Sequence, residues 1–394
     1  MPRADRGEVF DAREICIVHT IQRCVRQAYL AGKDAVSGRD FEPRREWIRR
    51  RLEILASVFG IDVLSYAILS NHMHLILRNR PDVVATWSDR QVAERWLKLF
   101  PGRRLDEHLG QPTENDIATL QRDKDRLNII RTRLSDISWF MRSACEPIAR
   151  LANKQDGVTG RFWEGRFKAQ RITDEAGLLA CAMYVDLNPV RAAMAETPEQ
   201  SEHTSAYDRI KSLKGQQLDS AASELVPVSL EQAAAEIQST TPAQRRQKAA
   251  LRKSGKNVKS GDRPTPHHRI ARDGWLAPLA LQERKHTGPQ ASRSGIRASD
   301  KGFLSMPLPD YLTLLDWTGR QGRRDKRGKI PAQLRPILQR LGIEGSMWCD
   351  LVWNFKRYFG RCAGSPGSLQ TTAATQNRHW HRGQRAAKNC FTAT

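Results

Sequence analysis

The pattern of apolar and polar positions is most regular in the first half of the chain. Runs rich in Ile, Leu and Val predict strands at 14–24, 61–77 and 167–172. Apolar residues at helical spacing predict helices at 45–59, 135–153 and 173–188. We expect Ser135 and Thr173 to cap the last two helices. The stretch 61–77 should fold as a hairpin that turns at Ser70 and Asn71, its clearest turn signal.

This order of elements predicts the fold class. Strand, helix, strand, strand, helix and strand follow one another, and an extra helix comes after the last strand. That order is typical of the ferredoxin-like, or split βαβ, arrangement. We therefore expect an α+β fold, with an antiparallel sheet that carries its helices on one face and an α-helical C-terminal extension.

The remaining segments suggest four parts. Residues 10–200 form the predicted main domain, with a polar insertion at about 81–128 that has some helix around 91–99. Residues 201–270 are expected to be a basic, partly disordered linker, since 245–259 contain no acid. Residues 271–364 predict a small helical accessory domain, and 365–394 a disordered tail. Truncation near Thr240 should then leave the main domain folded.

Composition narrows the choice of partner. The 394 residues carry a formal net charge of +22, which favours a polyanionic partner. On charge alone, nucleic acid, a ribosome or an anionic membrane surface would fit equally well. No apolar run approaches the roughly 20 residues of a membrane span, and the N-terminus lacks a signal peptide's apolar segment, so we expect a cytoplasmic protein without a membrane partner. Seven scattered cysteines without a CxxC indicate neither a zinc ribbon nor a disulfide framework.

Two histidines interrupt the predicted hairpin. In "SNHMHLIL", His72 and His74 lie one residue apart within an apolar run. Residues two apart in a strand point to the same face, so both imidazoles should project side by side, with Met73 on the other face. Two imidazoles are costly to bury unless something binds them. The pair therefore suggests a metal site, although a satisfied core pair remains an open alternative.

A metal needs further ligands, and the helix after the last strand offers candidates. Tyr184 and Asn188 are four residues apart in "YVDLN" and so share a helical face. A histidine pair on a central strand, with a Tyr and an amide on a helix that crosses the sheet, resembles the HUH nucleases and more specifically their single-tyrosine transposases. The stretches "LSNHMHLIL", "GRFWEGRFKAQRI" and "YVDLNPVRAAM" resemble the REP-associated tyrosine transposases, over about 14–194, roughly half of the chain.

The resemblance implies a role for each of four residues. His72, His74 and Asn188 would hold a divalent metal ion, Mg²⁺ or Mn²⁺, and Tyr184 would be the nucleophile. The implied activity is a transposase that nicks and rejoins single-stranded or hairpin DNA through a 5′-phosphotyrosine link. DNA is then the expected partner, whereas monomer and homodimer both remain open.

Other residues are weaker candidates. Trp163, Arg166 and Arg191 could contact DNA, although Trp163 could equally be core and Arg191 structural. The basic turn 320–329 adds Arg320, Arg323 and Arg324 as candidate DNA contacts.

Further histidines and a second tyrosine are poor rivals. His19 on the first strand is a minor candidate for an extra ligand. His379 and His381 form a second HxH in the polar tail, without an apolar strand around it. Tyr207 lies outside the helix face that carries Tyr184.

Two other functions compete with the transposase. A nucleic-acid-binding regulator could keep the fold and lack catalysis, but the presence of His72, His74, Tyr184 and Asn188 argues against such decay. An RNA-binding protein of ferredoxin-like fold would carry aromatic side chains on its open sheet face, where this chain carries the histidine pair.

Overall fold

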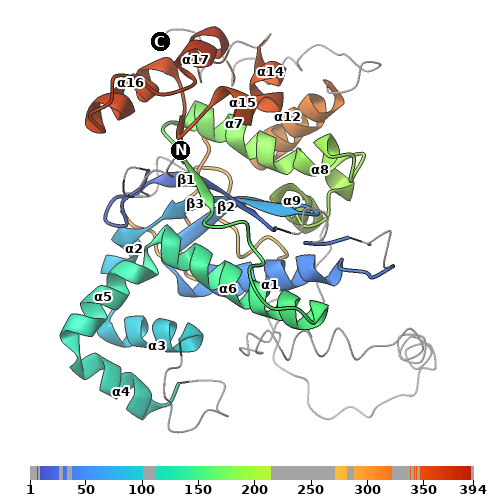
Figure 1. Ribbon diagram of the computed structural model, residues 1–394. Coiled ribbons are helices and arrows are strands. Elements are labelled where there is room, and N and C mark those ends of the chain that lie inside the picture. The colour runs from blue at the N-terminus through green and yellow to red at the C-terminus, as the bar shows by residue number, and fades with distance from the viewer. Residues whose placement is uncertain are drawn as a thin grey trace, which may run out of the picture.

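A five-stranded sheet separates two layers of helices in the computed structural model (Figure 1). The structure describes residues 7, 9–25, 30–32, 38–100, 112–213, 271–281, 288–321, 338, 341, 343 and 347–391. The strands, in the spatial order β2-β3-β1-β4-β5, are β1 (Ile17–Arg23), β2 (Ile61–Ile68), β3 (His72–Asn79), β4 (Lys168–Ile172) and β5 (Cys362–Ala363). The first four pair antiparallel, and β5 joins β4 in parallel. This topology confirms the predicted α+β class and its split βαβ core.

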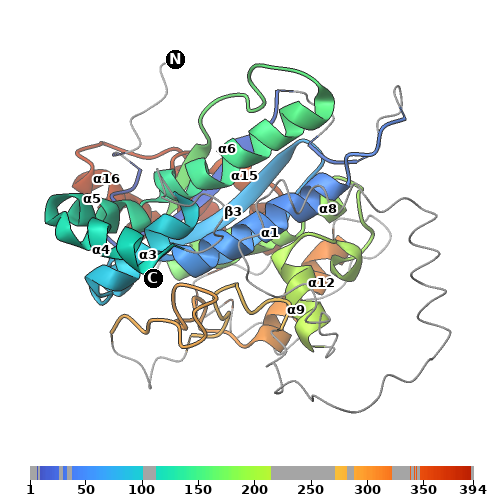
Figure 2. The same cartoon turned by 90° about the horizontal axis from the view of Figure 1, so that it is seen from below.

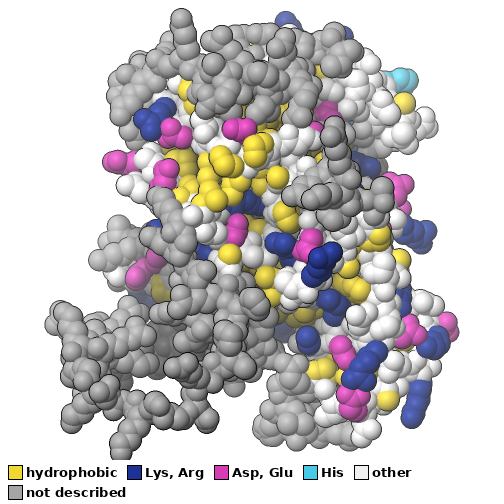
Figure 3. Space-filling view, turned by 180° about the vertical axis from the view of Figure 1, so that it is seen from behind, with side chains coloured by type: hydrophobic (Ala, Val, Ile, Leu, Met, Phe, Trp, Pro, Cys, Tyr) yellow, Lys and Arg dark blue, Asp and Glu magenta, His cyan; other side chains and the backbone are white. Residues whose placement is uncertain are grey.

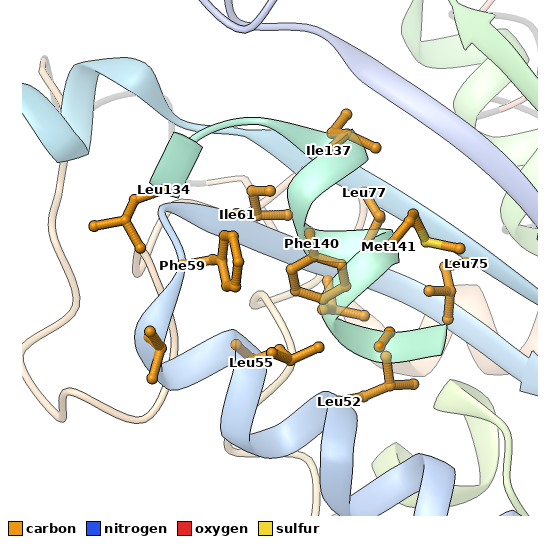
Figure 4. Close-up of a cluster of buried hydrophobic side chains, with 14 of the residues drawn as sticks. Leu52, Leu55, Phe59, Ile61, Leu75, Leu77, Leu134, Ile137, Phe140 and Met141 are labelled. Carbon is orange, nitrogen blue, oxygen red and sulfur yellow. The ribbon is translucent and has the colours of Figure 1, made fainter. Parts of the chain in front are cut away.

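The first helical layer packs on an apolar face of the sheet. It contains the two helices of the split βαβ core, α1 (Pro43–Val58) and α6 (Ile137–Asp156). Figure 2 shows both helices beside β3. Leu52 and Leu55 of α1 and Phe140 of α6 meet Leu75 and Leu77 of β3 in one buried cluster (Figure 4). Burial of each such side chain contributes about 1.5–3 kcal/mol, so this interface is a main source of stability.

The insertion is more helical than the sequence indicated. It forms α2 (Pro81–Ala85), α3 (Asp89–Leu99), α4 (Glu114–Arg122) and α5 (Lys124–Leu134). Ser88 and Thr113 begin α3 and α4 with capping boxes, which satisfy backbone N–H groups that a helix start leaves unpaired. Trp96 of α3 packs against Trp139 of α6, with ring centroids 5.6 Å apart. The insertion therefore extends the first layer rather than forming a loop.

The second layer covers the opposite face of the sheet and continues to the C-terminal end of the described chain. Its elements are α7 (Glu175–Asp186), α8 (Asn188–Arg191), a 3₁₀ turn η2 (Pro198–Gln200), α9 (Ser205–Leu213), α12 (Leu308–Gln321), α14 (Trp348–Trp353), α15 (Phe355–Tyr358), α16 (Pro366–Thr375) and α17 (Gln384–Cys390). One hydrophobic cluster runs from Ile76 of β3 through Leu179 of α7 to Leu314 of α12 and Trp348 of α14. The C-terminal half thus shares its core with the predicted main domain.

The close approach of α7 to β5 shows how tightly the two halves join. A Cβ atom on Gly177 would lie 2.9 Å from the Gly364 Cα, so no larger residue fits there without a shift of backbone. Asp174 caps α7 by accepting from the Gly177 N–H, and its other carboxylate oxygen accepts from the Ser365 N–H. The cap of α7 is therefore Asp174 rather than Thr173. In the same way, Asp136 rather than Ser135 caps α6.

Buried carboxylates also tie late segments to β2. Asp62 accepts from the Arg78 guanidinium at 2.7 Å and from the Ser299 N–H at 3.0 Å. Asp208 of α9 accepts from the Tyr66 hydroxyl at 2.7 Å and pairs with Arg49 of α1. A buried charge is tolerated only where such partners satisfy it, so losing one partner would be costly.

These contacts change the expected domain organisation. Residues 365–394 were expected to be a disordered tail, yet α16 and α17 lie there and bury Leu369 and Ala387 in the second-layer cluster. A chain cut near Thr240 would lose every element of that layer from α12 onward, so we expect such a fragment to be unstable.

The basic stretch 245–259 lies outside the described residues. No helix among the described residues combines the length and apolarity needed to cross a membrane.

Replacement of Trp348 tests whether the two halves unfold together. Trp348 is fully buried and donates its indole N–H to Thr318 Oγ1 at 2.9 Å. Trp348→Ala should lower the free energy of unfolding by about 3–5 kcal/mol. Because the core is shared, denaturant titration should still show a single transition when followed both by far-UV circular dichroism and by fluorescence.

The matched control is Trp380→Ala. The Trp380 side chain is 68% exposed, so its loss should change stability by no more than about 0.5 kcal/mol. Two separate transitions in wild-type protein, with only one affected by Trp348→Ala, would instead support an accessory domain that folds independently.

Candidate metal and tyrosine site

Three histidines lie together on the second face of the sheet. His72 and His74 come from β3, and the antiparallel register places His19 of β1 beside them. The ring centroids of His72 and His74 are 4.9 Å apart, and those of His19 and His74 are 5.1 Å apart. Met73 points to the opposite face, where it joins the first-layer core. The alternation expected from "HMH" is thus what the structure shows.

A chain of hydrogen bonds fixes the orientation of His74. The Gln170 amide donates to the Gly360 carbonyl at 2.7 Å, which turns the Gln170 carbonyl oxygen toward His19. His19 Nδ1 lies 3.3 Å from that oxygen and donates to it, so His19 Nε2 carries the lone pair. This nitrogen lies 2.9 Å from His74 Nδ1 and accepts a hydrogen bond from the N–H there. Because Nδ1 of His74 carries the proton, Nε2 of His74 carries the lone pair.

That nitrogen is the best candidate for a metal-binding atom. Within the described residues, His74 Nε2 is buried and has no hydrogen-bond partner. His72 donates from Nδ1 to the Asn71 side-chain oxygen, which leaves Nε2 of His72 with a lone pair as well. Burial lowers the pKa of His19 and of His72 to about 4 each, and the pKa of His74 falls well below its usual value for the same reason. All three rings are therefore neutral at pH 7, as metal ligands must be.

The two rings fit a shared ion, although they do not complete its coordination. A metal ion at about 2.1 Å from a ring nitrogen lies roughly 3.2 Å from that ring's centroid, so two rings 4.9 Å apart can share one ion. In the part of the chain that the structure describes, no group of three His, Cys, Asp or Glu side chains is arranged to hold a metal. A site at the histidine pair therefore needs a ligand of another type, such as an amide oxygen.

Tyr184 of α7 lies directly over the histidines. Its ring meets His74 and His19 edge-on, with centroids 5.6 Å and 6.0 Å apart. The side chain is only 5% exposed. Burial raises the pKa of the Tyr184 phenol, whereas hydrogen bonds from Asn188 and the charge of Arg191 oppose that rise. The Arg191 guanidinium lies 5.1 Å from the ring centroid, close to the oxygen whose negative charge it would stabilise.

Asn188 lies beside Tyr184. The helix α7 ends at Asp186, so Asn188 begins α8 instead of lying within the helix predicted for 173–188. The chain still turns helically there, and the Asn188 side-chain N–H donates to the Tyr184 carbonyl at 3.1 Å. Because the amide nitrogen is used in this way, the amide oxygen is the atom that could serve as a ligand.

The C-terminal half supplies residues that the sequence did not reveal. Phe355 of α15 stacks on the Tyr184 ring, with centroids 5.7 Å apart. The next residue, Lys356, lies near His72 and lines a small cavity with it. Tyr311 of α12 donates its hydroxyl to the buried Asp186 carboxylate at 2.7 Å and so holds the end of α7. Only the pairing of Gln170 with His19 could have been inferred, from the register of β1 and β4.

The remaining candidates differ in where they lie. Trp163 is only 8% exposed and donates its indole N–H to the Cys145 carbonyl at 2.8 Å, which favours the structural reading. Arg166 is exposed and lines the cavity beside His72. Arg320 pairs with Asp316 on the surface of α12. Arg323 and Arg324 lie outside the described residues.

The rival histidines and tyrosine do not join the site. His381 is buried with Nε2 3.7 Å from the Cys362 sulfur, and its neighbour His379 is exposed. Tyr207 lies on α9, where its hydroxyl donates to Glu202 at 3.4 Å. His19 contacts His74 directly, and its position suits a support for His74 better than a further ligand.

Comparison with known proteins finds one weak structural similarity. No protein-family description matches the chain, and no curated protein does. Among solved structures, a REP-associated tyrosine transposase bound to a REP hairpin is similar, with 12% identity, a TM-score of 0.30, and coverage of 52% of this chain and 82% of that one. A likeness at this level carries no argument about this chain.

Removal of the histidines should abolish stabilisation by metal. A ligand that binds only the folded state at 100 times its dissociation constant raises the free energy of unfolding by about 2.7 kcal/mol. Wild-type protein should show this gain with Mn²⁺, whereas the double variant of His72→Ala and His74→Ala should show none. His379→Ala, an exposed histidine, should keep the full gain. Equal Mn²⁺ affinity in the double variant and wild type, measured by calorimetry, would place the metal elsewhere.

Loss of the amide that orients His19 should weaken metal binding without removing a ligand. Gln170→Leu breaks the link from Gly360 to His74, and loss of such an outer contact typically costs 10–100-fold in metal affinity. The control is Gln370→Leu, which changes an exposed residue of α16 in the same way. Calorimetry with Mn²⁺ should separate the two variants, and identical affinities would show that the hydrogen-bond chain has no influence on the site.

Proposed function

We propose that this protein is a metal-dependent DNA transposase that nicks and rejoins single-stranded or hairpin DNA through a 5′-phosphotyrosine link. The observation that carries the proposal is the position of Tyr184 against the unpaired Nε2 of buried His74. A nucleophile and a ligand-ready imidazole meet there on one face of the sheet. The resemblance of "LSNHMHLIL" and "YVDLNPVRAAM" to single-tyrosine transposases points to the same two positions.

The residues around Tyr184 suit an attacking phenol. In the attack, Tyr184 Oη bonds to phosphorus, the bond from phosphorus to the 3′ oxygen breaks, the phenol loses its proton and the 3′ oxygen gains one. A phenol with a raised pKa is a poor nucleophile unless a nearby group stabilises its anion. Arg191 lies over the ring and Asn188 hydrogen-bonds to the phenol, so both lower the cost of losing the proton.

The histidines and Asn188 would hold the metal. Two neutral imidazoles and an amide oxygen leave open positions on a divalent ion for oxygens of the scissile phosphate. Bound there, Mg²⁺ or Mn²⁺ would offset the negative charge that develops on the phosphate. His19 and Gln170 keep the His74 lone pair directed at this position before DNA arrives. His74 is therefore oriented before the substrate binds.

The covalent link explains why rejoining needs no added energy source. A phosphotyrosine retains the energy of the cleaved phosphodiester, so the 3′ hydroxyl of another strand can attack it and release Tyr184. A hydrolase would instead direct water at the link. The net charge of +22 agrees with a DNA partner, since phosphate contacts by Lys and Arg supply most non-specific affinity for DNA.

One observation favours a second candidate function. Tyr184 is 5% exposed and lies under Phe355, so in this state its hydroxyl is poorly accessible. A nucleic-acid-binding regulator on the same fold would have no need of an accessible tyrosine. The two candidates differ in whether a covalent adduct with DNA forms.

Replacement of Tyr184 by Phe tests the proposal. Wild-type protein incubated with Mn²⁺ and a labelled hairpin oligonucleotide that carries single-stranded flanks should yield a protein–DNA adduct that survives denaturing electrophoresis. Tyr184→Phe removes the attacking oxygen and keeps the ring that packs on Phe355, so binding and stability should persist while the adduct disappears.

Tyr207→Phe provides the matched control, because it removes the hydroxyl from a second tyrosine, outside the site. Its adduct should equal that of wild type. A full adduct in Tyr184→Phe would assign the nucleophile to another residue. Binding without any adduct in wild type, with several hairpin sequences and metals, would favour the regulator.

A further inference from the structure

The cavity beside His72 gathers more positive than negative charge. Four cationic side chains line it: Arg23 of β1, Lys168 of β4, Lys356 of α15 and Arg166. Glu164 is the one acidic side chain in the lining. The cavity measures about 70 Å³. One water needs roughly 10–15 Å³ of such volume, so the space suits a group of about five atoms, which is the size of a phosphate.

The cations converge because of the sheet register. Arg23 pairs with His72 across β1 and β3, and Lys168 pairs with Ile21 across β1 and β4. Paired residues of antiparallel strands point to the same face, so Arg23 and Lys168 flank the outer end of the face that carries the histidines. Lys356 approaches that end from the second layer, one residue beyond the Phe355 that stacks on Tyr184.

The mutual repulsion of these cationic side chains is not relieved by close ion pairs in the described part of the chain. In the described part of the chain, none of Arg23, Lys168 and Lys356 has a carboxylate within 4.0 Å. Partial burial lowers the pKa of Lys356, the charges of Lys168 and Arg23 lower it further, and the charge of Glu164 opposes this shift. On the rear face, by contrast, Figure 3 shows Lys and Arg side chains interspersed with Asp and Glu. A cluster that costs free energy in the unbound protein is expected where an anion binds.

A larger groove continues from this cavity. Gln22, Gly165 and Arg166 line both spaces, so the two meet around the end of β1. The groove measures about 880 Å³ and runs along α6, where the half-buried Trp139 and the exposed Arg142 face it. Aromatic side chains beside cations are the usual means of holding a single strand. The groove therefore favours a polynucleotide over a free small anion as the occupant of the cavity.

We propose that this cavity binds a backbone phosphate of the single strand that enters the site, and that Lys356 is the phosphate-binding residue supplied by the C-terminal half. The proposal rests on the proposed function, since it takes the strand to be the DNA that Tyr184 attacks. It adds a positioning contact beside His72, outside the predicted metal ligands and the nucleophile. It also assigns the C-terminal half a direct role in holding the substrate.

The test measures binding alone, so that it does not depend on catalysis. Binding of a labelled single-stranded oligonucleotide is followed by fluorescence anisotropy at several salt concentrations, with EDTA present and Tyr184→Phe as the background. Each phosphate contact on a single strand contributes about −0.7 to the slope of log K against log salt. Lys356→Gln should make the slope less negative by about 0.7 and weaken binding roughly fivefold at about 0.1 M salt. Lys356→Arg should retain both values.

Lys388→Gln is the matched control. It removes the same charge from an exposed lysine of α17 in the same half of the chain. Its slope should equal that of the background, and the thermal stability of all variants should agree, because Lys356 and Lys388 are both exposed.

The outcomes separate the two proposals. An unchanged slope in Lys356→Gln, or an equal loss in Lys388→Gln, would overturn the phosphate site and leave the tyrosine chemistry standing. A changed slope together with no adduct in the tyrosine assay would uphold the phosphate site and remove the catalytic proposal. A protein that binds no single strand at any salt concentration would overturn both.

Discussion

The alternation of side chains along β3 is the constraint on which the rest of the structure depends. Leu75 and Leu77 face the first layer and make an ordinary apolar contact with α1 and α6. His72 and His74 face the other way, and their polar nitrogens need partners or a ligand. One strand thus separates the first layer, with its apolar interface, from the layer that carries the candidate site. A register shift of one residue would exchange the two faces and destroy both.

The second layer meets this constraint with polar groups drawn from distant parts of the chain. His19 and Gln170 satisfy one side of His74, and Gly360 fixes the amide of Gln170. The buried Asp186 accepts hydrogen bonds from Ser65, Ser205 and Tyr311, so α7 is held against β2, α9 and α12 at once. The position of Tyr184 is therefore set by contacts that extend through the whole layer, and a change far from the ring can move it.

The sequence predicted those features that depend on local pattern. Period-two alternation predicted that His72 and His74 share a face, and the order of elements predicted the sheet. Helix limits were less well predicted, because Asp136 and Asp174 compete with their neighbours Ser135 and Thr173 as caps and only the tertiary contacts decide. The roles of Phe355 and Lys356 could not be predicted, since no local signal links α15 to a histidine nearly three hundred residues earlier. Polar composition was misleading for the last thirty residues, whose helices α16 and α17 are stabilised by packing rather than by propensity.

The hydrogen bond between Gln170 and Gly360 has a consequence for the newly made chain. The two residues are 190 positions apart. At about 5–20 residues per second, a ribosome needs roughly 10–40 s to add that length. During this interval β1 to β4 and the three histidines of the site have been synthesised, but β5 and the carbonyl that orients Gln170 have not, and neither has the aromatic ring that stacks on Tyr184. The nascent sheet therefore has an incompletely covered polar face, and it must avoid aggregation until the second layer arrives.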